Sequence, residues 1–199
     1  MEQPYHKYIF DTENRKFVGK FEEMYKNEDI EGYDSWFQED SLHLEKILSL
    51  EIIKKYIFNS ILDIGCGKGA FTKYLKKPNN HVLGVDISET AIKKARDKYN
   101  NIEFRKLSAD EALSLPQKWD LIIILEVLSY LENWKRIIER ASEKTKYLYI
   151  SLYLPADPIG YVKDFEALRG EIGKYFSIET ELIKDRESMF ILGKNKKGA

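Results

Sequence analysis

From residue 61 onward, short apolar runs alternate with stretches in which apolar residues recur at helical spacing. The runs predict buried strands over residues 61–64, 81–86, 102–106, 119–125 and 146–152. The stretches between them predict amphipathic helices near residues 71–76, 89–99 and 132–144. Strands that alternate with helices are typical of βαβ units, so this part of the chain predicts a parallel sheet.

The end of the chain follows a different pattern. Prolines interrupt the alternation, and residues 161–174 predict one more helix. Two strands follow over residues 176–183 and 188–193, joined by the charged residues 184–187. Because parallel neighbours need a long crossover, so short a connection requires an antiparallel pair. The chain is therefore expected to form a mostly parallel, seven-stranded α/β sheet with a C-terminal antiparallel hairpin strand.

The first part of the chain, residues 1–58, carries no strand pattern. Within it, residues 38–56 predict a helix, and an aromatic-rich stretch precedes that helix. No internal repeat, low-complexity tract or linker divides the sequence. We therefore expect a single domain over residues 1–199, with an N-terminal helical region (1–58) and an α/β core (59–199).

Composition narrows the class of protein. The chain of 199 residues fits one domain, and its net charge of −1 argues against binding nucleic acid chiefly by neutralising phosphates. The single cysteine excludes an intramolecular disulfide and favours a reducing compartment. The N-terminus lacks a signal-peptide pattern, and the longest apolar run, residues 121–125, is too short to span a bilayer. We expect a soluble, cytoplasmic monomer or homodimer with no nucleic-acid or membrane partner.

The stretch with the clearest chemistry follows the first predicted strand. It has an acidic residue and then glycine at every second position: Asp63-x-Gly65-x-Gly67-x-Gly69. Glycines let the backbone turn sharply and approach a ligand, as nucleotide-binding turns require. A dinucleotide-binding turn reads G-x-G-x-x-G, whereas here a carboxylate precedes the first glycine and suits a ligand with an amino group. A tight turn without ligand, or a different nucleotide site, stays open at this point.

The whole run from Asp63 through Gly69 resembles motif I of the class I S-adenosylmethionine-dependent methyltransferases. The resemblance implies a Rossmann-like three-layer sandwich whose seventh strand runs against the others, in agreement with the predicted hairpin. It also implies S-adenosyl-L-methionine as the cofactor, held by Asp63 and by the turn residues Gly65, Cys66, Gly67 and Gly69. We interpret Cys66 itself as a small apolar filler, because no adjacent base would activate its thiol.

Acidic residues also stand at the ends of the next two strands. Asp86, 21 residues after Gly65, is expected to accept both ribose hydroxyls of an adenosine, with Ile87 beside it in the cofactor site. The alternative for Asp86 is a helix N-cap, although Ser88 already fits that position. For Asp110, and for its neighbour Glu111, the resemblance implies a contact with adenine. The alternative for this pair is a surface loop or a helix cap.

The segment Leu-Glu-Val-Leu-Ser-Tyr-Leu at residues 125–131 follows the fourth strand, where open α/β sheets place their ligand crevice. The residues of this segment resemble the corresponding segment of the N-methyltransferases of nodulation factors. It lacks the Asn/Asp-Pro-Pro-aromatic motif of DNA amino-methyltransferases and the second glutamate of protein arginine methyltransferases. Glu126 could act as a general base or orient an amine, line the cofactor pocket, or be a carboxylate in a first helical turn. His43 is a second candidate base, with a purely structural role as its alternative.

Aromatic residues before the first long helix complete the prediction. The resemblance implies that the N-terminal region covers the active site, and Tyr33 and Trp36 are expected to close over the sulfonium cofactor, with simple packing as the alternative. The three histidines have no metal-ligand spacing, so we expect no metal. The predicted activity is methyl transfer to N or O of a small molecule, such as an amino sugar or saccharide intermediate. The alternatives are a non-catalytic S-adenosylmethionine-binding domain and a nicotinamide-dependent oxidoreductase.

Overall fold

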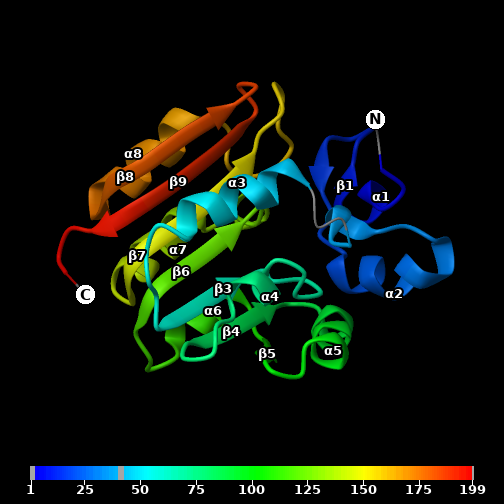
Figure 1. The fold of residues 1–199 in the computed structure, drawn as a ribbon. Coiled ribbons are helices and arrows are strands. Elements are labelled where there is room, and N and C mark those ends of the chain that lie inside the picture. Colours follow the sequence, from blue (N-terminus) through cyan, green and yellow to red (C-terminus); the bar gives the residue numbers. More distant parts are fainter. Residues whose placement is uncertain (1–2, 40–42, 199) are drawn as a thin grey trace.

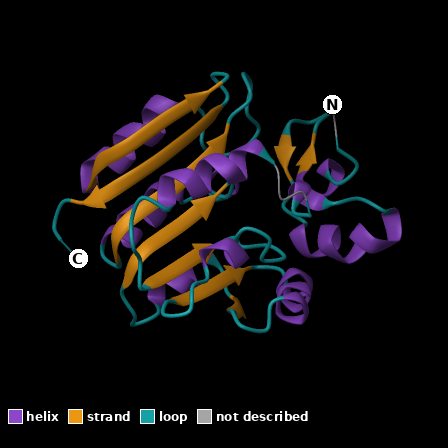
Figure 2. Ribbon diagram, viewed as in Figure 1, coloured by secondary structure: helices purple, strands orange, loops and turns teal. Residues whose placement is uncertain are grey.

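The computed structural model describes residues 3–39 and 43–198. A twisted sheet forms the middle layer, helices cover both of its faces, and the N-terminal elements formed by residues 6–37 lie beside one end of the strands (Figures 1 and 2). That end is where the parallel strands finish, so the N-terminal elements face the carboxyl edge of the sheet. Among the described residues, no helix is both long enough and apolar enough to cross a membrane.

The central sheet has seven strands in the order β5-β4-β3-β6-β7-β9-β8. All neighbours pair in parallel except that β9 runs antiparallel to both β7 and β8. This arrangement confirms the expected mostly parallel sheet with a C-terminal antiparallel hairpin strand. The strands are β3 (Ser60–Ile64), β4 (His81–Asp86), β5 (Glu103–Lys106), β6 (Trp119–Leu125), β7 (Thr145–Tyr153), β8 (Phe176–Lys184) and β9 (Ser188–Asn195).

The helices of the core lie between these strands, close to where the periodicity predicts them. One helix was not predicted: α6 is only six residues long and is fixed by a capping box in which Ser108 and Glu111 bond each other. The helix after the glycine turn, α4, is a single turn. The core helices are α4 (Thr72–Leu75), α5 (Glu89–Lys98), α6 (Ala109–Ser114), α7 (Trp134–Ser142) and α8 (Phe165–Tyr175), and a short 3-10 turn, η2 (Leu128–Tyr130), follows β6.

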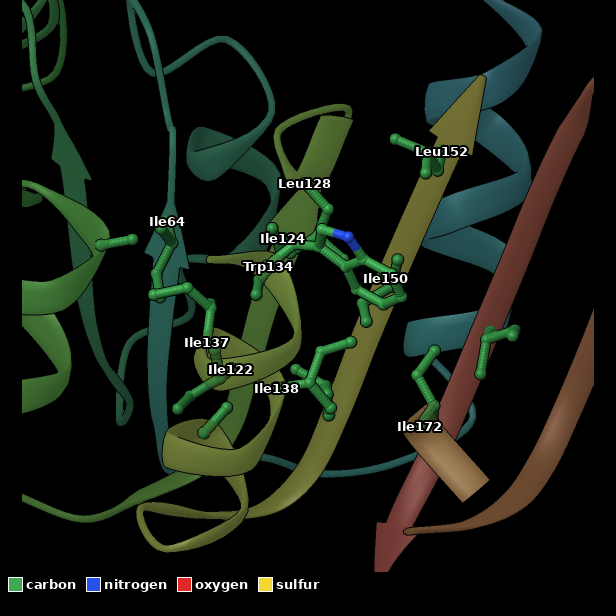
Figure 3. Close-up of a cluster of buried hydrophobic side chains, with 14 of the residues drawn as sticks. Ile64, Ile122, Ile124, Leu128, Trp134, Ile137, Ile138, Ile150, Leu152 and Ile172 are labelled. Carbon is green, nitrogen blue, oxygen red and sulfur yellow. The ribbon is translucent and has the colours of Figure 1, made fainter. Parts of the chain in front are cut away.

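The core consists of two apolar layers, one on each face of the sheet. Along β6, Ile122 and Ile124 belong to one layer, and their neighbours on the strand belong to the other. Figure 3 shows Ile137 and Ile138 of α7 packed over the first of these layers. Burying an isoleucine side chain contributes about 1.5–3 kcal/mol, so these two layers supply most of the stability of the sheet.

The N-terminal region differs from its prediction in two ways. It contains a short antiparallel pair, β1 (Phe10–Asp11) with β2 (Lys16–Phe17), although no strand was expected there. Strands of two residues are too short to show a period of two. The helix predicted over 38–56 is observed as α3 (Leu44–Ile53), and residues 40–42 lie outside the described part. The remaining N-terminal elements are α1 (His6–Ile9), α2 (Phe21–Glu31) and a 3-10 turn, η1 (Ser35–Phe37).

The strand order reverses between β3 and β6, and β6 is the central strand of the sheet. In open α/β sheets, such a reversal leaves a crevice outside the carboxyl ends of the strands. The glycine turn follows β3 at this point, and Glu126 follows β6. The topology therefore brings the glycine turn and the segment after β6 to one place.

Candidate active site

The glycine turn has a backbone that only glycine adopts at low cost. Gly65 has φ +79°, and a Cβ built on it would lie 2.2 Å from Cγ2 of Val127. Gly67 has φ +52°, and a Cβ there would meet the side chains of Gln38 and Tyr25. Both positions combine left-handed backbone with close neighbours, so a larger residue would be strained and would clash. Glycine is therefore required at both positions.

Asp63 lies buried in β3, directly before the turn, and is 2% exposed. In the described part of the chain, its hydrogen-bond donor is the Thr72 hydroxyl at 2.6 Å, and no cation pairs with it. Burial raises the pKa of this carboxyl to about 7, and the nearby Asp86 adds to the shift. A buried carboxylate without a cationic partner is costly. Asp63 is thus suited to receive a positively charged ligand group.

Asp86 ends β4 on the other side of the turn. Its carboxylate accepts the backbone N–H groups of Gly67 and Ser88, both at 2.9 Å. Burial raises its pKa, and the two N–H groups oppose that shift. The cap of α5 is made by the Ser88 hydroxyl, which accepts from Ala91 at 3.1 Å, so Asp86 is not needed there. Next to it, the apolar side chain of Ile87 is 58% exposed at the strand end.

Asp110 and Glu111 lie in the first turn of α6. The carboxylate of Asp110 accepts from Asn133 at 2.8 Å and from Arg140 at 2.6 Å, and these two donors lower its pKa. Glu111 closes the capping box with Ser108, which is the helix-cap alternative for this residue. Asp110 is therefore engaged with α7, and its contact with adenine stays a prediction.

Glu126 occupies a strained turn immediately after β6, with φ +56°. Its carboxylate folds back onto β7, where it accepts the Ser151 hydroxyl at 2.7 Å and the Tyr153 N–H at 2.6 Å. Burial raises the pKa of Glu126, the two donors oppose the shift, and Glu45 adds to it. The residue precedes η2, so the first-turn helical alternative is wrong. The carboxylate is instead held in one orientation at the edge of the crevice.

His43 stands before α3 and is half-buried. Its Nδ1 lies 2.7 Å from Oε2 of Glu45, and its ring stacks on Phe37 with centroids 5.4 Å apart. The structure gives no direct interaction between His43 and Glu126 among the described residues. Glu45 lies near both: its Oε2 is 2.7 Å from the His43 ring, and its charge acts on Glu126. The pair of candidate bases thus lies in one region without contact.

The two aromatic residues expected at the cofactor have different surroundings. The Tyr33 hydroxyl donates to the carbonyl of Met24 at 2.6 Å, which ties Tyr33 to the first half of α2. Trp36 packs against Tyr5 and against Tyr130 of η2, with ring centroids 5.1 and 5.8 Å apart. Tyr33 therefore braces the N-terminal region, and Trp36 joins that region to the segment after β6. Contact of either ring with a cofactor stays a prediction.

Tyr130 is covered by a wider aromatic cluster. Its ring stacks on Phe17, with centroids 5.6 Å apart and planes inclined by 15°, and meets Phe21 edge-on at 5.3 Å. Edge-on and offset contacts of this kind are each worth about 0.5–1.5 kcal/mol beyond the buried area. The N-terminal elements thus pack directly on the segment that the sequence identifies as a clue to the substrate.

Ionic contacts that are hardly visible in the sequence hold the N-terminal elements to the core. Nζ of Lys68, inside the glycine turn, lies 2.7 Å from Oε1 of Glu28 in α2 and 3.0 Å from Asp34. Glu28 is 3% exposed and also pairs with Lys94 of α5 at 2.9 Å. Although burial alone would lower the pKa of Lys68, Glu28 and Asp34 raise it, so the lysine stays charged. The only visible signal was a lysine in a glycine turn.

A second contact lies at the start of α5. Glu22 of α2 accepts the hydroxyls of Ser88 and Thr90 at 2.6 and 2.7 Å. Burial raises the pKa of Glu22, but these hydrogen bonds outweigh that effect and lower it to about 2. The carboxylate also lies at the positive end of the α5 dipole, which favours negative charge there. Together with Lys68, this contact fixes α2 against the core.

Comparison with known proteins identifies the class. Residues 62–146 match the family of methyltransferase domains. The chain is 30% identical over 125 residues to a ubiquinone biosynthesis O-methyltransferase of Hydrogenovibrio crunogenus, covering 57% of this chain and 52% of that protein. It is 32% identical over 108 residues to a malonyl-(acyl-carrier protein) O-methyltransferase of Acetivibrio thermocellus, covering 52% and 38%. The chain thus spans about half or less of the length of these curated relatives.

Solved structures share the fold. The N-methyltransferase NodS from Bradyrhizobium japonicum, in complex with S-adenosyl-L-homocysteine, superposes with a TM-score of 0.67 at 21% identity, covering 86% of this chain and 98% of that chain. The PH0226 protein from Pyrococcus horikoshii gives a TM-score of 0.67 at 20% identity, covering 80% and 93%. The matched domain includes the whole glycine-turn motif, Asp63 through Gly69, and the sheet order agrees with the resemblance stated for that motif. These findings support the resemblance of the chain to the class I S-adenosylmethionine-dependent methyltransferases.

Proposed function

We propose that this chain transfers a methyl group from S-adenosylmethionine to a nitrogen or oxygen atom of a small molecule. The observation that carries the proposal is Asp63: a buried carboxylate without a cationic partner, placed directly before a turn that excludes any Cβ. A ligand ammonium would supply the missing positive charge. The amino-acid end of S-adenosylmethionine carries such a group.

The other residues of the turn fit the rest of the cofactor. Asp86 has two carboxylate oxygens to offer a pair of ribose hydroxyls, and Ile87 presents exposed apolar surface where an adenine ring would rest. Gly65 and Gly67 carry no Cβ that would keep a ligand away from the backbone of the turn. When bound, the cofactor supplies an activated methyl group on a sulfonium. The protein then has to position the acceptor, exclude water and, for some acceptors, remove a proton.

Glu126 is the residue that we propose for the acceptor. Ser151 and Tyr153 hold its carboxylate in one orientation, and burial raises its pKa, which favours the uptake of a proton. A hydroxyl acceptor would need this base, whereas an amine needs only to be neutral when it attacks. We propose His43 as a second base for acceptors that reach the start of α3. The N-terminal elements would serve as a lid that excludes water.

The class of acceptor is inferred from the segment after β6. Its similarity to nodulation-factor N-methyltransferases supports an amino sugar or saccharide intermediate, and the fold shared with NodS agrees with this. The curated relatives named for O-methylation support a hydroxyl acceptor instead. We therefore propose a small-molecule acceptor with either nucleophile, and a chain that acts without nucleic acid.

Titration calorimetry tests the cofactor. Wild-type protein is expected to bind S-adenosylhomocysteine and not NADH; binding of NADH alone would contradict the proposal and favour an oxidoreductase. Asp63→Asn keeps the shape of the side chain and removes its charge, so it is expected to lose binding with the fold intact. Asp97→Asn, on the exposed face of α5, is the matched control and should bind as the wild type does. Equal affinity in Asp63→Asn would refute the role of Asp63.

A second function is favoured by one observation: both oxygens of Glu126 are already hydrogen-bonded to β7. A domain that only binds S-adenosylmethionine would need no free base. Release of S-adenosylhomocysteine, measured with panels of amino sugars, amines and phenols, separates the two functions. Turnover with any acceptor excludes the non-catalytic domain, and binding without turnover across all panels supports it.

A further inference from the structure

The face of the glycine turn that a ligand would contact is covered by the protein's own side chains. A Cβ on Gly67 would lie 2.5 Å from Nε2 and 2.7 Å from Oε1 of Gln38, and 2.7 Å from the Tyr25 hydroxyl. In this conformation the cofactor site is closed by Gln38 and Tyr25.

The backbone N–H groups of the turn show how this closure works. All five groups, from residue 65 to residue 69, are hydrogen-bonded. The N–H of Lys68 donates to Oε1 of Gln38 at 2.7 Å, and Gln38 lies outside the α/β core. The other four acceptors belong to the core: the carbonyl of Val85 for Gly65 and Cys66, the carboxylate of Asp86 for Gly67, and the carbonyl of Cys66 for Gly69.

The nitrogen of the Gln38 amide also has a partner, which orients the amide. Its Nε2 donates to the Tyr25 hydroxyl at 2.8 Å. Tyr25 is 3% exposed, and burial together with the charge of Asp86 raises its pKa, so the phenol is neutral. A neutral phenol can donate as well as accept. The Lys68 N–H and the Tyr25 hydroxyl therefore both border the position of the Gln38 amide.

We infer that Gln38 occupies the subsite of the cofactor's α-carboxylate, and that the Lys68 N–H and the Tyr25 hydroxyl bind that carboxylate once Gln38 has moved away. The inference rests on the proposed function for the identity of the ligand. An amide oxygen and a carboxylate oxygen are both acceptors, so the same loop donor serves either. Cofactor binding then has to displace Gln38, and the apparent affinity is reduced by the fraction of molecules in which the subsite is filled.

The test compares two ligands that differ at this end. S-adenosylhomocysteine carries the amino-acid group, and 5′-methylthioadenosine lacks it. By calorimetry, Gln38→Ala is expected to bind S-adenosylhomocysteine about three- to tenfold more tightly than the wild type, because the Gln38 side chain no longer competes with the ligand. Its affinity for 5′-methylthioadenosine should be unchanged. Gln117→Ala, at the opposite edge of the sheet, is the matched control and should change neither affinity.

Three results would overturn the inference: weaker binding of S-adenosylhomocysteine, no change, or an equal gain for both ligands. Weaker binding would mean that Gln38 contacts the cofactor, and an equal gain would mean a general opening of the site. On the Gln38→Ala background, Tyr25→Phe should lower the affinity for S-adenosylhomocysteine about three- to tenfold and leave the affinity for 5′-methylthioadenosine unchanged. Undiminished affinity there would refute the role of Tyr25.

A measurement without ligand keeps this inference separate from the proposed function. Hydrogen exchange of the Lys68 amide should be faster in Gln38→Ala than in the wild type, because its acceptor is lost; unchanged exchange would refute the contact. If neither the wild type nor any variant binds S-adenosylhomocysteine, the proposed function fails. If all bind it with equal affinity, the proposed function stands and this inference fails.

Discussion

The forces that stabilise the α/β core differ from those that attach the N-terminal segment (residues 5–39) to it. Within the core, apolar side chains from both faces of the sheet interdigitate with α7, α8 and α3. Between the segment and the core, the contacts include an aromatic cluster at Tyr130 and a series of ion pairs and hydrogen bonds at Lys68, Lys94 and Ser88. Apolar burial is non-directional, whereas ionic contacts demand particular partners. Apolar burial therefore stabilises the core, and the ionic contacts fix the position of the segment.

This difference matters because the segment covers the cofactor site. Buried charges stabilise little in net terms, since their attraction must first offset the loss of hydration. A segment attached by such contacts adopts one specific position on the core, although the contacts stabilise it only weakly. The first experiments should therefore separate the stability of the core from the closure of the segment.

The largest expected effect lies in the core. Ile137→Ala would remove buried contacts between α7 and the sheet and leave a cavity, at a cost of about 2–5 kcal/mol in the free energy of unfolding. Denaturation in urea measures it. Because Ile137 is remote from the ionic contacts, the N-terminal segment should keep its protection from hydrogen exchange relative to the core. A selective loss of protection in residues 21–31 would contradict the separation of the two regions.

The next effect lies at the attachment. Glu28→Gln would leave Lys68 and Lys94 without their shared carboxylate, costing about 1.5–3 kcal/mol because the hydrogen bonds to a charged group are lost. We expect faster hydrogen exchange in residues 21–39 and little change in β3 or β6. Glu31→Gln, whose carboxylate pairs with Lys7 within the segment, is the control and should change exchange only slightly. If both variants behave alike, the contact at Lys68 is not what holds the segment.

The third effect is a dependence on pH that begins in the core. With its pKa raised to about 7, Asp63 must lose a proton before it pairs with an ammonium. The affinity for S-adenosylhomocysteine should therefore fall as pH decreases below about 7, by up to tenfold per unit. Without ligand the sign is opposite: the folded protein binds the extra proton, so Asp63 reduces stability as pH rises from 3.8 to about 7. Calorimetry and urea denaturation between about pH 5 and pH 8 measure the two trends, and Asp63→Asn should abolish the trend in stability.

The smallest effect is expected from salt. The outer ion pairs of the segment, such as Lys98 with Glu39 and Lys94 with Asp29, are partly exposed. Added salt screens such pairs, each of which is worth at most about 1 kcal/mol. Raising the salt concentration should speed hydrogen exchange in the segment a few-fold and leave the core unchanged. A core that responds as strongly as the segment would show that the two regions do not differ in their ionic contacts.

The sequence predicted the core well because its information is local. Apolar runs located the strands, and Asp63 and Asp86 were placed at the turn because each stands at the end of such a run. The features that were not predicted are short elements or contacts between residues far apart in the sequence. Strands β1 and β2 have two residues each, and α6 has six, too few to establish a period.

The attachment of the segment was missed for another reason. Glu28 and Lys68 are 40 residues apart, and no spacing rule relates them. The backfolding of Glu126 onto β7 likewise depends on a left-handed turn that its residue type does not suggest. Contacts of this kind follow from the assembled fold and become visible only with it.

The position of β9 has a consequence for how the chain is made. This strand is the last of the sheet in sequence, yet it lies between β7 and β8 and is the only described neighbour of β8 (Figure 1). On a ribosome, β8 emerges before its partner exists, and its backbone groups stay unpaired until β9 has been synthesised. Since synthesis adds about 5–20 residues per second, this exposed interval is short but unavoidable. We expect the C-terminal half of the sheet to form late, with β9 inserted as its final step.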